Sequence, residues 1–399
     1  MPPETVPMPR GMRADFAASW PVAAAFLAIG IYWGSFAALV PVLKARVGAS
    51  DAEFGVAMLV AAVGALMAMW VAARIDAALG RRALPAMTAV LALAFLLPGL
   101  ATTVWAFALA MLCASCASGA LDVLMNARLS EVERRTGRSL MSLNHGLFSV
   151  TYAASALYCG VARDLGFGPV VILAALGLVS LMLIRAQTRL TVERPPAGAD
   201  EAGRRGLALL PTVLLGFIIL LAYLAEQGTE GWSALYLERG LGARASGGAL
   251  GPALLGLTMG FGRIFGQTLV ARIGEVGLMR GGALLAACGG LLAALAPTIW
   301  IAYLGFALLG LGISVIGPMA YALAGRDCTD AGRARTIAEI SVIGYFGFFI
   351  GPPIIGFLSE AYGLGTAFGA IGFSILIVPL VLLPLYLRQR AGKLISLRR

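Results

Sequence analysis

The stretch LAEQGTEGWSALYL, Leu224 to Leu237, closes an apolar run that begins at Leu207. The run is long enough to cross a membrane, because about 20 apolar residues span ~30 Å of hydrocarbon. Glu226 and Glu230 lie four residues apart in it, so a helix would place both carboxylates on one face. Since hydrocarbon cannot solvate two carboxylates, we expect this face to line a water-filled cavity within a bundle of membrane helices.

The composition extends this expectation to the whole chain. Of its 399 residues, 60% are hydrophobic and 13% are charged, and the mean hydropathy is +0.89. A soluble domain is typically about 45–50% apolar and about 25% charged, so the composition indicates a multi-pass membrane protein. We expect an all-α fold of twelve transmembrane helices at residues 17–43, 54–73, 83–101, 104–127, 141–161, 168–186, 207–236, 249–271, 281–296, 298–323, 337–358 and 365–387.

The net charge of +10 raises the alternative of nucleic-acid binding, but its distribution favours another origin. Most Lys and Arg residues fall in the termini and in the loops on one side of the twelve spans. By the positive-inside rule that side is cytoplasmic. We therefore expect a cell inner membrane protein with both termini in the cytoplasm and no nucleic-acid partner. The opposite side holds five basic residues: Lys44, Arg46, Arg163, Arg239 and Arg244.

The chain also repeats itself at about half its length. VAARI, which ends at Ile75, matches LVARI, which ends at Ile273, and Trp33 in the first span matches Trp232 in the seventh. Transporters use such repeats to build a central site that opens alternately to each side of the membrane. The sequence thus predicts a six-helix half at residues 1–186, a polar cytoplasmic linker at 187–206 and a second six-helix half at 207–399.

A family resemblance rests on a basic loop after the second span and on four longer stretches. The loop ends in Gly80-Arg81-Arg82 with Ala77 at its usual acidic position, and resembles the signature G-x-x-x-D-R-x-G-R-R of the major facilitator superfamily. The longer stretches are similar to a bacterial branch called YbjJ-like, which is related to fucose permeases. They are DVLMNARLSEVE (Asp122 to Glu133), NHGLFS (Asn144 to Ser149), EQGTEGWSALYL (Glu226 to Leu237) and GYFGFFIGPPIIGFLSE (Gly344 to Glu360).

The resemblance implies a solute transporter and leaves the solute open. The chain departs from these relatives at two places, and residue roles cannot be transferred to it there. The branch usually has an Asp directly before the Trp of WSALYL, where this chain has Gly231, and the first span lacks the acid that fucose permeases carry there.

Arg263 is the charged residue placed deepest in the second half. An Arg at the centre of a transmembrane helix costs about 2.5–3.5 kcal/mol on insertion scales, and the repeat counterpart of Arg263 is an alanine. We expect Arg263 to pair with a carboxylate, Glu226 in particular, and to line a cavity with Glu226 and Glu230. The alternatives are a purely structural ion pair for Arg263 and solvation in an outer loop for Glu230, where Gly228 and Gly231 favour a bend.

A second polar group is predicted on the cytoplasmic side. Asp122 and Asn126 share one face of the fourth span, and His145 reaches a similar depth in the fifth. An Asp–His pair at low dielectric is suited to proton handling, because His titrates near neutrality. The alternative is a hydrogen-bonded contact that joins the two helices.

Aromatic side chains add a third set of candidates. Tyr32 and Trp33 in the first span and Trp232 in the seventh lie in the outer half of the membrane. Their rings are suited to stacking on a sugar ring or an apolar solute, although core packing is the more frequent use of an aromatic residue.

Together these features predict a secondary transporter of a small organic solute, coupled to protons and monomeric in the bilayer. The sequence has no Walker A pattern, which excludes ATP drive of the usual kind. We expect no enzyme activity, cofactor or metal site, and interpret Cys113 and Cys116 as packing residues inside the fourth span. The alternatives are an exporter of amphipathic or toxic compounds and a non-transporting membrane receptor.

Overall fold

The computed structural model describes residues 11–190, 207–328 and 330–396, and within these ranges the chain is helical and contains no strand. The first half comprises α1 (Met12–Arg46), α2 (Asp51–Leu79), the 3₁₀ turn η1 (Gly80–Arg82), α3 (Ala83–Ala94), α4 (Leu96–Leu100), α5 (Val104–Thr136), α6 (Met141–Asp164) and α7 (Pro169–Gln187). The second half comprises α8 (Leu209–Leu235), the π-helix η2 (Tyr236–Gly240), α9 (Ala245–Ala294), α10 (Ile299–Asp327), α11 (Asp330–Tyr362), α12 (Leu364–Ile377), the π-helix η3 (Val378–Leu382) and α13 (Leu383–Ser396).

These elements are consistent with the twelve predicted spans. Among the described residues, nine helices are long and apolar enough to cross a membrane. The two longest, at residues 51–100 and 245–294, each cover two predicted spans. The first is interrupted by η1, and the second turns at Gly274, whose φ of 71° is a left-handed conformation that favours glycine. α6 is not among the nine, and its first turns carry the polar residues Ser142, Asn144 and His145.

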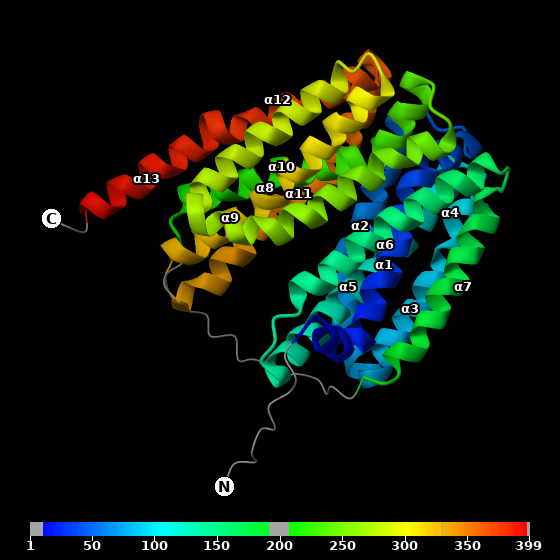
Figure 1. Ribbon diagram of the computed structural model, residues 1–399, viewed down its shortest axis with the longest axis horizontal. Helices are drawn as coiled ribbons and strands as arrows, with labels where there is room; N and C mark the ends of the chain where they lie inside the picture. The colour runs from blue at the N-terminus through cyan, green and yellow to red at the C-terminus, as the bar shows by residue number, and fades with distance from the viewer. Residues whose placement is uncertain (1–10, 191–206, 329, 397–399) are drawn as a thin grey trace, which may run out of the picture.

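The two halves form two bundles that meet at one end and diverge toward the other (Figure 1). At the end where they meet, α2 packs against α11 and α6 packs against α9. A Cβ on Gly55 of α2 would lie 2.6 Å from the carbonyl oxygen of Pro352, and a Cβ on Gly160 of α6 would lie 2.6 Å from the Cβ atom of Ala249. Glycine therefore permits both crossings. We call this end the closed end and the other the open end.

The start of α2 at the closed end is set by a capping box. The Ser50 hydroxyl accepts a hydrogen bond from the Glu53 N–H at 3.2 Å, and the Glu53 carboxylate accepts one from the Ser50 N–H at 2.8 Å. Two of the free N–H groups at the start of the helix are thereby satisfied. Asp51 becomes the first residue of α2 and points toward the second half.

The basic loop at the open end is also ordered by an acid. Arg128 of α5 forms an ion pair with Asp76 of α2 and donates a hydrogen bond to the Gly80 carbonyl oxygen at 3.3 Å. The carboxylate that the loop signature lacks at Ala77 is thus present one residue earlier.

Both ends of the described chain, the beginning of α1 and the end of α13, lie toward the open end (Figure 1). Most of the predicted linker, at residues 191–206, lies outside the described residues, as do residues 1–10 and 397–399. The cytoplasmic location of the termini stays a prediction from the charge distribution.

Candidate functional site

The face of α8 that carries the two carboxylates is directed into the protein. Glu226, Gln227 and Glu230 are partly exposed, whereas the intervening Gly228 and Thr229 are buried. α8 continues as a regular helix through this segment, and its π-helical end begins six residues after Glu230 at Tyr236. The bend predicted at Gly228 and Gly231 is therefore wrong, because both residues fit the helix.

The predicted ion pair between Arg263 and Glu226 is present. Nη2 of Arg263 on α9 lies 3.4 Å from Oε1 of Glu226, and the side chains are 34% and 18% exposed. One contact at this distance is weaker than a bidentate arginine–carboxylate pair. The guanidinium group therefore keeps donors free for another acceptor.

Glu230 has a different set of neighbours. Its carboxylate accepts a hydrogen bond from Nε2 of Gln227 at 3.1 Å, and the Tyr152 hydroxyl of α6 lies beside it. The carboxylate belongs to the contact between the two halves, so the alternative of solvation in an outer loop does not apply in this structure.

A cavity of about 310 Å³ opens beside Arg263, between α6, α9 and α10. This volume is in the range of small-molecule sites, which are typically ~300–1,000 Å³. Polar groups from all three helices reach it, together with Met141, Ile264 and Met319 as apolar walls. The polar side chains that line it are Ser142, His145, Arg263, Gln267 and Ser314.

The predicted cluster of Asp122 and Asn126 with His145 is not assembled in this structure. Asn126 donates to the Asp122 carboxylate at 3.1 Å, as predicted, and Asp122 lies near Tyr345 of α11. His145 instead packs edge to face on Phe26 of α1, with ring centroids 5.1 Å apart, and interacts with the Arg263 charge.

The physical reason is that α5 and α6 turn their polar faces toward different neighbours. The depth of each residue along its helix was predictable from spacing, but the direction of each face depends on packing. No hydrogen bond or ion pair joins Asp122 to His145 within the described ranges.

The aromatic candidates are split between cavity and core. Trp33 is partly exposed, and its Nε1 donates to the Ser118 hydroxyl at 3.0 Å. With Trp232, Gln227 and Glu230 it lines a small second pocket of about 10 Å³ toward the closed end. Trp232 itself is 1% exposed and packs on Phe54.

Tyr32 does not line either cavity. It is 1% exposed, its ring packs edge to face on Phe95 with centroids 4.3 Å apart, and its hydroxyl points at the Met111 sulfur. Adjacent residues on a helix point about 100° apart, so Tyr32 faces the core of the first half while Trp33 faces the second.

One group near the site was not predicted from the sequence. Tyr223 of α8 stacks on Phe348 of α11 at 4.3 Å and on Tyr345 at 5.8 Å, and the Tyr321 hydroxyl lies 3.0 Å from that of Ser341. Tyr223 lies three residues before Glu226, a spacing that could have indicated the shared face. The pairing with α11 required the tertiary structure.

The chain has measurable similarity to known proteins. The profile of the family described as Major Facilitator Superfamily matches residues 22–334 and 212–396. An uncharacterized MFS-type transporter of Yersinia pestis is 33% identical over 359 residues, which cover 89% of this chain and 92% of that protein. An uncharacterized transporter of Sinorhizobium fredii is 31% identical, over 88% of this chain and 93% of that protein.

A solved structure gives the corresponding result for the fold. The crystal structure of a bacterial homologue of the human lysosomal transporter Spinster, in an inward-facing and occupied conformation, matches with a TM-score of 0.74. The match covers 93% of this chain and 96% of that chain at 15% sequence identity, so it shows a shared fold.

Proposed function

Because this chain belongs to the major facilitator superfamily, we propose that it is a secondary active transporter that moves a small organic solute across the bacterial inner membrane. Transport proceeds by alternating access of the central site, with both termini in the cytoplasm and the protein acting as a monomer. We assign the chain to the YbjJ-like branch on the stretches quoted above.

The observation that carries the proposal is the loosely paired Arg263 at the edge of the 310 Å³ cavity. A partly buried arginine that makes one 3.4 Å contact has donors left for a solute. His145, Gln267 and Ser142 supply further hydrogen-bonding groups around the same space. This set suits a polar solute with several oxygen or nitrogen atoms.

Proton coupling is the second part of the proposal, and Asp122 is its carrier. An acid that lacks a cationic partner takes up a proton more readily than one held by an arginine. Glu226 is paired with Arg263, whereas the hydrogen-bond partner of Asp122 is the neutral Asn126. Asp122 also lies between the two halves, near Tyr345, where a change of charge affects their approach.

The test begins with a screen of solutes for those that raise the melting temperature of the purified protein. A stabilising solute is then followed in proteoliposomes under an imposed pH gradient. We expect accumulation that follows the gradient and collapses with a protonophore. Solute movement that does not depend on the pH gradient would indicate facilitated diffusion. A gradient-driven flux of solute in the outward direction would favour export.

Two variants sharpen this test. Asp122→Asn should abolish accumulation while exchange at equal pH continues, because the proton site is lost and the solute site is intact. Glu339→Gln is the matched control, since this acid forms an ion pair with Arg335 at the exposed start of α11. Equal loss of accumulation and exchange in Asp122→Asn would assign Asp122 to structure or solute binding.

A further inference from the structure

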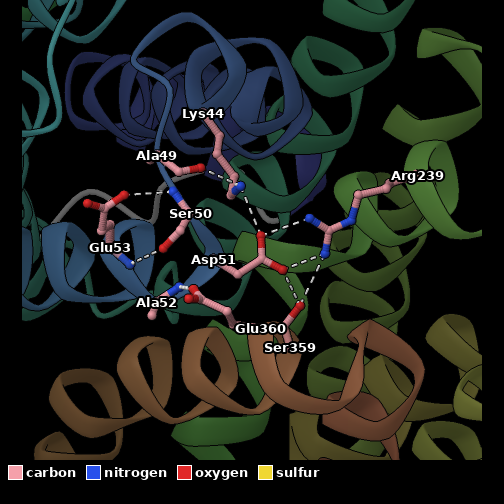
Figure 2. A network of polar contacts seen from close by, with 9 residues as sticks. All are labelled: Lys44, Ala49, Ser50, Asp51, Ala52, Glu53, Arg239, Ser359 and Glu360. Carbon is pink, nitrogen blue, oxygen red and sulfur yellow. Dashed lines mark hydrogen bonds and ion pairs between the residues drawn. The ribbon is translucent and has the colours of Figure 1, made fainter.

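The closed end contains an ion-pair network whose centre is Asp51, and Figure 2 shows its members. Lys44 of α1 lies 2.9 Å from the Asp51 carboxylate, and Arg239 of the second half donates to it at 2.8 Å through Nη1. Nη2 of Arg239 and the Ser359 hydroxyl of α11 bind its other oxygen. The Asp51 side chain is 4% exposed, and these bonds satisfy both of its oxygens.

Glu360 adds a further bond between the halves. Its carboxylate accepts a hydrogen bond from the Ala52 N–H at 2.8 Å, at the first turn of α2. A negative charge near the start of a helix is favourable, because the free N–H groups and the helix dipole are positive there.

A second ion pair joins the halves on the α6 side. Arg163 of α6 binds Glu238 through two hydrogen bonds of 2.7 and 2.8 Å, and Arg163 also donates to the Ala38 carbonyl oxygen at 2.9 Å. This is the bidentate geometry in which arginine–carboxylate pairs are strongest. The side chains are 12% and 17% exposed, so water competes little for either partner.

Both ion pairs originate from adjacent residues of one short element. Glu238 and Arg239 lie in the π-helix η2, and they point to different sides of it, one to α6 and the other to α2. Single π-helical turns occur frequently at functional sites. Other described ion pairs, such as Arg128–Asp76 and Arg326–Glu275, stay within one half.

We propose that Asp51, Arg163, Glu238 and Arg239 form a clasp, which holds the closed end shut and must separate when that end opens. This inference rests on the proposed function, since a transporter that works by alternating access has to open here in its other state. η2 continues α8 directly, and Glu230 precedes Glu238 by eight residues, or ~12 Å of helix. Movement of α8 on solute binding therefore acts on both ion pairs at once.

The strength of the clasp follows from its position. Opening would expose Asp51 and Glu238 to water, which solvates the separated charges and limits the cost. Arg239 is already 46% exposed. Each pair should therefore bias the equilibrium between closed and open states by about tenfold, which corresponds to ~1.4 kcal/mol.

The experiment measures the opening directly, without solute or ion gradient. Spin labels are attached to cysteines introduced by Leu165→Cys after α6 and Leu295→Cys after α9, with the five native cysteines replaced. Both sites are exposed, at 70% and 81%. Distances between the labels are then measured by double electron–electron resonance in lipid nanodiscs.

We expect one dominant short distance in the parent protein. Asp51→Asn should raise the ratio of long to short distances about tenfold, and Asp51→Asn combined with Glu238→Gln should raise it further. Gly248→Ala provides a variant that leaves all charges in place, because a Cβ there would lie 2.4 Å from Oε1 of Glu238 and displace the carboxylate.

Exchanging the two charges of an ion pair distinguishes loss of that pair from a general disturbance of the structure. Glu238→Arg alone should favour the long distance, and Glu238→Arg with Arg163→Glu should return most molecules to the short one. Arg326→Gln is the matched control, since it breaks an ion pair to Glu275 inside the second half, and its distances should equal those of the parent.

Unchanged distances in the Asp51→Asn and Glu238→Gln double variant would overturn the clasp, and so would a charge exchange that fails to restore the short distance. These outcomes are independent of transport. Absence of solute movement in proteoliposomes would contradict the proposed function, whereas unchanged label distances with intact transport would contradict the clasp alone.

Discussion

The Arg263→Ala substitution should cost this protein more stability when Glu226 is present than when Glu226 has also been replaced by alanine. With Arg263 removed, the Glu226 carboxylate stays inside the membrane region with its side chain 18% exposed and its ion pair lost. With both side chains shortened, no charge is left without a partner at this position.

The geometry of the pair sets the size of the effect. At 3.4 Å, the gross attraction is about 5 kcal/mol for an effective dielectric constant of ~20, and desolvation of both charges removes most of it. Exposed pairs are worth about 0.2–1 kcal/mol, and removing one partner of a fully buried pair costs about 3–5 kcal/mol. Exposures of 34% and 18% with one contact lie between these limits, so we expect a coupling of about 1–2 kcal/mol.

The assay is a double-mutant cycle on the purified protein. Melting temperatures in one detergent are compared for the parent, Arg263→Ala, Glu226→Ala and the double variant. The same cycle on Arg335 and Glu339 is the control, because this pair is four residues apart on one helix, with side chains 67% and 38% exposed, and should couple more weakly. Simple additivity at Arg263 and Glu226, or a coupling no larger than the control, would refute the reasoning.

Three further predictions concern topology and packing. A reporter that is active only in the cytoplasm should be active when fused after Arg399, and a reporter that is active only in the periplasm should be inactive at the same point. An active periplasmic reporter with an inactive cytoplasmic one would contradict the positive-inside orientation. Gly34→Ala should lower the melting temperature strongly, because a Cβ there would lie 2.0 Å from the Tyr152 carbonyl oxygen where α1 crosses α6. Such overpacking typically costs ~1–3 kcal/mol. In the control Gly168→Ala the added Cβ meets no atom within 4 Å, and an equal shift in the two variants would contradict the prediction. Ser50→Ala should cost about 1 kcal/mol through loss of the capping box, measurable as a lower melting temperature that Ser50→Asp largely restores.

Several features of this protein follow from the sequence because their physics is local. The cost of placing a residue in hydrocarbon depends on that residue, so runs of apolar residues predicted the helices and the polar residues within them marked the interior. Arg263 and Glu226 were predicted to pair for the same reason, since neither charge can face lipid, and they lie on consecutive predicted spans of one half. The family follows from the whole pattern of spans and motifs.

Other features were decided by tertiary packing. Spacing along a helix gives the depth of a residue, but the direction of its face depends on which helices pack around it. That is why Asp122 faces α11 while His145 faces α1 and α9, and why Tyr32 enters the core while its neighbour Trp33 does not. The clasp could not be predicted either, because Asp51 and Arg239 are 188 residues apart and become partners through the approach of two separate halves.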